Sequence, residues 1–205
     1  MIHIIEVAIC PVCTRSSIGG ATHPGCRNKY TLDGLTSIFR YSGGIQRAIK
    51  HLKYRRMTDV ISSLVNLTIA QLQNEKERYR YFYTFIQNEK PPIIPIPLHW
   101  WRERGRWFNQ SELIGQEIAE RLQLEFKPDI LIRPKFKTPQ AGLTRKDRLT
   151  NIKGSFTINS NEKLRMTSAI LLVDDVWTTG ATLREAANIL KRAGVKRVWG
   201  FTVAR

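Results

Sequence analysis

The sequence predicts an α/β protein in which helices flank a twisted, mostly parallel sheet, and three observations support this fold class. Residues 169–173 carry no charged or polar side chain, which suits a strand buried on both faces of a parallel sheet. Apolar residues then recur at helical spacing in 183–190, so a helix would lay one apolar face on that sheet. A short apolar segment at 93–96 is likewise followed by a loop and a capped helix.

The other elements follow from turn signals and apolar periodicity. Residues 36–41 favour a strand, and Gly43–Gly44 indicates a break before two amphipathic helices at 45–54 and 59–73. Residues 75–90 are dense in Tyr and Phe, and we expect them to be helical and peripheral. The later predictions are a strand at 93–96, a helix capped by Asn109 and Glu112 that buries Ile114, Ile118 and Leu122, strands at 130–132 and 156–158, and an edge strand at 195–203.

The charge balance indicates an anionic partner. The 205 residues contain 33 Lys and Arg against 17 Asp and Glu, which gives a formal net charge of +16. This excess suits a polyphosphate substrate or nucleic acid, although a protein that is merely basic and soluble has the same composition. No apolar segment approaches the ~20 residues that span a bilayer, and no signal peptide is recognised, so we expect no membrane insertion and a cytoplasmic location.

The first 30 residues predict a small metal-binding unit. Cys10-Pro-Val-Cys13 is followed after nine residues by His23-Pro-Gly-Cys26, which supplies four ligands on two tight turns. Three thiolates and an imidazole suit tetrahedral Zn²⁺ in a closed, structural site. A redox Cys-x-x-Cys pair, with His23 present by chance, is the alternative. We therefore divide the chain into a zinc-binding knuckle at 1–30 and a main domain at 31–205.

A candidate phosphate site follows the strand at 169–173. Asp174 and Asp175 come directly after it, and a turn of small and hydroxyl residues then leads into the helix. Free backbone N–H groups at a helix N-terminus bind phosphate, whereas the two carboxylates would face sugar hydroxyls or Mg²⁺ carried by the ligand. Phosphate beside vicinal hydroxyls describes a ribose 5-phosphate. The residues of this turn are Thr178, Thr179, Gly180, Ala181 and Thr182.

The same segment has two other interpretations. A buried strand that simply ends in a solvated Asp pair would need no ligand. The Mg²⁺-binding acid strand of a P-loop NTPase requires G-x-x-x-x-G-K-[ST] upstream, and the sequence contains no such segment.

Three basic segments are further candidates for anion binding. Arg102, Arg104 and Arg106 lie between a strand and a helix, where guanidinium groups could pair with pyrophosphate, or form a solvated loop. Residues 133–151 are long, polar and basic, as in a lid or a disordered loop. The third basic segment, 34–58, contains no acidic residue. The basic side chains of its helix form either a nucleic-acid-binding surface or a solvated face, and they are Lys50, Lys53, Arg55 and Arg56.

The segment 169–182 resembles the phosphoribosyl pyrophosphate (PRPP) signature of type I phosphoribosyltransferases. The shared features are a hydrophobic strand, two acids, an apolar pair and Thr-Thr-Gly, in the same order and spacing. The resemblance implies that Asp174 and Asp175 bind the ribose hydroxyls, with Mg²⁺ accompanying PRPP. It also implies that 178–182 surrounds the 5-phosphate.

Over almost its full length, the sequence resembles the ComF family, the late-competence proteins of naturally transformable bacteria and their relatives. The matching pieces are the knuckles at 10–26, Arg106-Trp-Phe-Asn-Gln110, Gln140-Ala-Gly-Leu143 with Arg145, Arg148 and Asn151, Gly154-Ser-Phe156, and the PRPP segment. The chain departs from the family pattern in two places: Trp107 stands where a glycine is usual, and His23 where a cysteine is usual.

The family resemblance implies roles for the loops. The arginine loop at 102–106 would lie near pyrophosphate, and 134–150 would be a flexible lid that includes Gln140, Arg145 and Arg148. It also implies single-stranded DNA, and uptake and recombination proteins, as partners. Exposed aromatic side chains could stack on the bases of the DNA, and the basic helix could contact its phosphates.

Two functions of different classes follow. In the first, the protein is a phosphoribosyltransferase that releases pyrophosphate from Mg²⁺·PRPP and transfers the phosphoribosyl group to a nucleophile. The sequence assigns no catalytic base or nucleobase pocket, so the acceptor stays open. In the second, the PRPP site is a non-catalytic sensor in a protein that binds single-stranded DNA during uptake and transformation. A zinc-dependent scaffold with a vestigial PRPP site is a third interpretation, and the intact residues at 174–182 argue against it.

Overall fold

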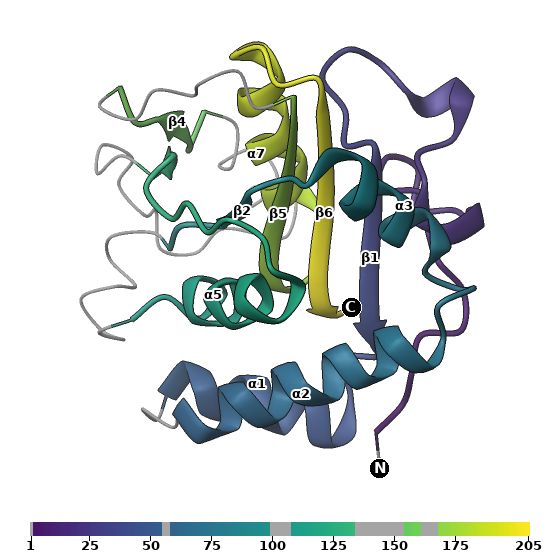
Figure 1. Cartoon of the computed structure of the whole chain (residues 1–205), viewed down its shortest axis with the longest axis vertical. Helices are drawn as coiled ribbons and strands as arrows, with labels where there is room; N and C mark the ends of the chain where they lie inside the picture. Colours follow the sequence, from purple (N-terminus) through teal and green to yellow (C-terminus); the bar gives the residue numbers. More distant parts are fainter. Residues whose placement is uncertain (1, 55–57, 99–107, 134–153, 161–167) are drawn as a thin grey trace, which may run out of the picture.

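A parallel four-stranded sheet forms the centre of the computed structural model, which describes residues 2–54, 58–98, 108–133, 154–160 and 168–205 (Figure 1). Its strands are β1 (Gly34–Phe39), β2 (Ile93–Pro95), β5 (Ala169–Val176) and β6 (Arg197–Ala204), in the order β1-β6-β5-β2. All three pairings are parallel, so the carboxyl ends of the strands share one edge of the sheet. A separate antiparallel ribbon pairs β3 (Leu131–Ile132) with β4 (Thr157–Ile158).

Helices cover both faces of the sheet. They are α1 (Gly43–Tyr54), α2 (Thr58–Asn74), α3 (Arg80–Glu89), α5 (Gln110–Leu122) and α7 (Ala181–Arg192), preceded by two 3₁₀ turns, η1 (Ile18–Gly20) and η2 (Pro24–Cys26). The helix α7 packs on one face, and the other four described helices contribute to the core on the opposite face. Within the described part of the chain, no helix is both long and apolar enough to cross a membrane.

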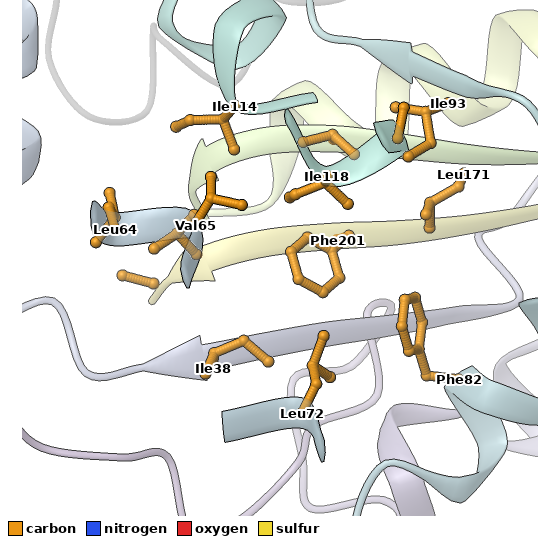
Figure 2. Close-up of a cluster of buried hydrophobic side chains, with 14 of the residues drawn as sticks. Ile38, Leu64, Val65, Leu72, Phe82, Ile93, Ile114, Ile118, Leu171 and Phe201 are labelled. Atoms are coloured by element: carbon orange, nitrogen blue, oxygen red, sulfur yellow. The ribbon is translucent and has the colours of Figure 1, made fainter. Parts of the chain in front are cut away.

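The side chains of β5 alternate between two hydrophobic cores. Leu171 and Val173 face the core shared with α1, α2, α3 and α5, whereas Ile170 and Leu172 face the core shared with α7. Each of these four side chains is completely buried, and burying one aliphatic side chain contributes about 1.5–3 kcal/mol. Figure 2 shows the first core, in which Phe201 of β6 and Phe82 of α3 meet residues of α2 and α5. Burial on both faces explains why residues 169–173 contain no polar side chain.

Most predicted elements are present, with shifted ends. The strands at 93–96 and 169–173 and the helix at 59–73 are confirmed. The first strand begins at Gly34 rather than at 36, and Gly43–Gly44 opens α1 rather than separating it from the strand. Asn109 caps α5 as predicted, since its side chain accepts a hydrogen bond from the Ser111 N–H at 3.1 Å.

Two predictions about position are wrong. The strand predicted at 195–203 as an edge is β6, which lies between β1 and β5. Its alternation of apolar and small residues suggested one exposed face, but Thr202 is fully buried and its hydroxyl hydrogen bonds Ser37 at 2.7 Å. The segment predicted as peripheral contains α3, whose Phe82 and Phe85 are buried in the core because their rings pack on β6.

The contact between Gly34 and Trp199 gives a test of this packing. A Cβ at Gly34 would lie 2.3 Å from the indole ring of Trp199. That ring cannot move easily, because it stacks on Phe85 and donates a hydrogen bond to Thr36 at 3.0 Å. We therefore predict that Gly34→Ala lowers the free energy of unfolding by roughly 1–3 kcal/mol in urea denaturation. Gly25→Ala is the control, since a Cβ there meets nothing within 4 Å. Equal stability of both variants would contradict the packing.

Candidate functional site

Two strand–helix units bring their polar residues together at the carboxyl edge of the sheet. Asp174 and Asp175 stand at the end of β5, next to β2, and Ser111 lies in the first turn of α5. The Ser111 hydroxyl donates a hydrogen bond to Asp174 Oδ1 at 2.8 Å, and the backbone N–H of Asp175 donates to the same oxygen at 2.9 Å. The carboxylate of Asp174 is therefore fixed both by α5 and by the backbone of its own strand.

The start of α5 is fixed against β2 by Asn109. Its amide Nδ2 donates to the Ile96 carbonyl at 3.0 Å, while its Oδ1 caps the helix. Gln110 beside it is 2% exposed, and its Nε2 has no hydrogen-bond partner among the described residues. The helix N-terminus thus presents Ser111 to the acid pair in a constrained position. Neither Ser111 nor this contact was predicted, because its partner lies 63 residues away in the sequence.

The predicted phosphate turn connects β5 to α7. Gly180 has φ +75° and precedes α7 directly, and residues 177–180 alone separate the end of β5 from the helix N-terminus, where the first backbone N–H groups have no acceptor within the helix. A side chain at Gly180 would clash, since its Cβ would lie 2.1 Å from the ring of Trp177. The first turn of α7 contains no acidic residue, and Thr178 is exposed. This geometry can bind an anion beside groups that prefer hydroxyls or a cation.

The four predicted zinc ligands come together in the N-terminal segment. The ligand atoms of Cys10, Cys13, His23 and Cys26 all lie within 4.8 Å of one another. His23 Nδ1 is 3.3 Å from the Cys13 sulfur and 3.9 Å from the Cys26 sulfur. A tetrahedron with zinc bonds of 2.0–2.3 Å has edges of roughly 3.5–3.8 Å, so these separations fit the metal.

The tautomer of His23 also fits metal binding. Its Nε2 lies 2.9 Å from the Ser16 carbonyl oxygen. Because a carbonyl can only accept, Nε2 carries the hydrogen, and the lone pair of the neutral ring is on Nδ1, which faces the thiols. Ligating histidines are commonly oriented by such a bond from their other nitrogen.

Two of the thiols, Cys10 and Cys26, have pKa values shifted in opposite directions. Burial would raise the pKa of Cys10, but hydrogen bonds from the backbone of Cys13, His23 and Val12 lower this pKa to about 7. The hydrogen bond with Cys13 raises the pKa of Cys26 to about 11. Three thiolates this close repel one another, so a bound cation would be needed to hold all of them deprotonated.

Several predicted site residues lie outside the described part of the chain. They are Arg55, Arg56, Arg102, Arg104, Arg106, Gln140, Arg145 and Arg148. Of the basic helix, Lys50 is exposed on α1, and Lys53 belongs to the same helix. The lid predicted at 134–150 is likewise outside the described residues. The N–H of Gly154 donates a hydrogen bond at 2.6 Å to Glu185 of α7, the helix that follows the predicted phosphate turn.

Comparison with known proteins agrees with this architecture. Residues 109–204, which include α5, β5, the turn and α7, match the phosphoribosyl transferase domain family. The chain is 30% identical over 175 residues to Competence protein F of Haemophilus influenzae, covering 84% of this chain and 73% of that protein.

Two further relatives share most of the length. Competence protein ComFC of Bacillus subtilis is 24% identical over 208 residues, covering 96% of this chain and 78% of the relative. The DNA utilization protein YhgH of Escherichia coli strain K12 is 27% identical over 171 residues, covering 83% of this chain and 71% of that protein. With the phosphoribosyltransferase-like fold and the cysteine–histidine cluster, these similarities show that the chain belongs to the ComF family.

Proposed function

We propose that the protein binds Mg²⁺·PRPP at the β5–α7 turn and transfers its phosphoribosyl group to an acceptor, with release of pyrophosphate. One observation carries the proposal: an acid pair and an acid-free helix N-terminus stand side by side at the carboxyl edge of a parallel sheet. This edge is where open α/β sheets bind their ligands. Backbone N–H groups of 178–182 would hold the 5-phosphate, and Asp174 and Asp175 would accept hydrogen bonds from the ribose hydroxyls.

The chain's part in the reaction is positioning and charge stabilisation. In the transfer, the bond from C1 of the ribose to pyrophosphate breaks and a bond from C1 to the acceptor forms. Carboxylates held near the ribose would stabilise the positive charge that develops on C1, and a fixed 5-phosphate would orient the ring. The acid pair also suits Mg²⁺, which prefers carboxylate oxygens and would offset charge on the pyrophosphate. Arg102, Arg104 and Arg106 are proposed to bind the leaving pyrophosphate.

A double substitution of the acid pair tests ligand binding. Asp174→Asn with Asp175→Asn removes two charges but keeps the Oδ1 that accepts from Ser111, so the fold should persist. We predict a loss of PRPP affinity of about tenfold or more in calorimetric titration with Mg²⁺, because charge-assisted hydrogen bonds contribute about 1.5–3 kcal/mol each. Asp129→Asn, at an exposed position, is the control. Identical titration curves for wild type and the double variant would refute the assignment.

We also propose that the cluster holds one structural zinc per chain. The donor set and the 4.8 Å limit on its atom separations support Zn²⁺, which needs four soft or borderline ligands. Zinc would stabilise a segment that is too small to fold on its own.

Metal content tests this site. Purified protein should contain about one zinc per chain by mass spectrometry, and Cys13→Ser and His23→Ala should each lower that content. The control is His51→Ala, because His51 is exposed on α1 and outside the cluster. Full zinc retention in His23→Ala would assign the fourth ligand to another group.

A second candidate function is a PRPP sensor that binds single-stranded DNA without turnover. The net charge of +16, the exposed Lys50 and the names of the relatives, which refer to competence and DNA utilization, favour it. Pyrophosphate release from PRPP in the presence of candidate acceptors separates the enzyme from the sensor.

Salt dependence tests the DNA surface. For a single strand, log K falls by about 0.7 per log unit of salt for each neutralised phosphate. We predict that changing Lys50, Lys53, Arg55 and Arg56 to Glu abolishes binding of an oligodeoxythymidine and flattens the slope, while PRPP binding persists. The control changes four exposed basic residues elsewhere, with the same change in net charge: Arg27, Lys29, Lys76 and Lys196. Equal binding by both variants would mean that the four charges at positions 50, 53, 55 and 56 do not form the DNA surface.

A further inference from the structure

The N-terminal segment is attached along α7, the helix that begins at the phosphate turn. At its far end, Lys191 Nζ forms an ion pair at 2.7 Å with Asp33, which lies between this segment and β1, and both side chains are largely buried. At the next residue of the helix, the guanidinium of Arg192 lies 4.5 Å from the ring centroid of Tyr30. These contacts fix the body of the helix but do not involve the turn.

Arg184 contacts both the metal cluster's loop and the phosphate turn. Its Nε donates to the carbonyl of Pro11, which lies between Cys10 and Cys13, at 2.5 Å. Its Nη1 donates to the carbonyl of Thr179 at 3.1 Å. A single side chain therefore joins the first cysteine knuckle to the middle of the predicted 5-phosphate turn.

The same guanidinium lies 5.2 Å from the ring centroid of Trp177. Trp177 is 5% exposed and packs directly beneath Gly180, where a Cβ would lie 2.1 Å from its ring. Arg184 thus holds the turn at two points, through the Thr179 carbonyl and through the indole that supports Gly180. A shift of the guanidinium would move both the carbonyl and the indole.

The position of Pro11 depends on the knuckle that Cys10 and Cys13 close. A metal held by both cysteines would fix this loop, and with it the Pro11 carbonyl that accepts a hydrogen bond from Arg184.

We propose that Arg184 is a positioning residue that couples the cysteine–histidine cluster to the 5-phosphate turn, so that metal loading of the cluster raises affinity for a ribose 5-phosphate ligand. The proposal rests on PRPP binding at that turn. The metal itself touches no ligand and acts through the Pro11 carbonyl, Arg184 and the Thr179 carbonyl. Since coupling between two binding sites is reciprocal, PRPP must also strengthen retention of the metal.

The test measures that reciprocity. Zinc-loaded protein is brought to equilibrium with a chromogenic chelator of known zinc affinity, and the dissociation constant for zinc is obtained with and without saturating Mg²⁺·PRPP. In wild type, we expect PRPP to lower this dissociation constant about fivefold or more, at the lower end of typical allosteric coupling, and the ratio of the two constants measures the coupling. In Arg184→Gln this ratio should fall to about one. Arg184→Lys, which keeps the charge but cannot make both hydrogen bonds and the ring contact, should lose most of the ratio.

Arg192→Gln is the matched control, because Arg192 lies on the same helix and contacts the N-terminal segment without touching the turn. It should keep the wild-type ratio. Loss of the ratio in Arg192→Gln as well would show that docking of the helix, and not Arg184, carries the coupling, and would overturn the proposal. So would an unchanged ratio in Arg184→Gln. Thermal melting of each variant, with Arg184→Lys as the milder change, separates lost coupling from lost folding.

Calorimetric titration of wild type with PRPP distinguishes a failure of the proposed PRPP binding from a failure of the coupling to the metal. If zinc-loaded wild type does not bind PRPP, the proposed function fails and the coupling fails with it. If it binds PRPP equally well with and without zinc, and the zinc-free protein still melts cooperatively, only the coupling is overturned.

Discussion

The burial of β5 on both faces determines where the polar groups of the candidate site can stand. Helices α1, α2, α3 and α5 on one side and α7 on the other leave no polar position in the strand until its end. The polar residues therefore begin where the covering cores stop, at Asp174, and the chain must turn there to start α7. The same packing that stabilises the fold places carboxylates and a helix N-terminus at one edge of the sheet.

This constraint also explains how much the sequence could predict. The apolar segment, the acids and the turn are contiguous, and the cap at Asn109 is local, so composition and spacing were sufficient for both. The last strand was misplaced at an edge, because the buried Thr202 finds its partner Ser37 165 residues away. Ser111 and Arg184 were not predicted for the same reason: Arg184 meets Pro11 across 173 residues, a contact that only the folded chain creates.

The N-terminal segment is an integral part of this account. Its cysteine–histidine cluster has the donor set of a structural metal site, and its loop reaches the helix that follows the acid pair. The loop of this cluster contacts the fold at α7, the helix that begins at the turn. Its attachment to α7 connects the cysteine–histidine cluster to the β5–α7 turn through Arg184. The match to the phosphoribosyl transferase domain covers residues 109–204 and does not include this cluster.

We propose that the acid pair and the β5–α7 turn form a ribose 5-phosphate site. A crystal structure of the protein with Mg²⁺ and PRPP would show whether the ligand binds there. The account predicts the 5-phosphate oxygens at about 3 Å from backbone N–H groups of 178–182, with the ribose hydroxyls on Asp174 and Asp175. Phosphate density at another surface, such as the basic face of α1, with the turn empty at saturating ligand, would contradict it.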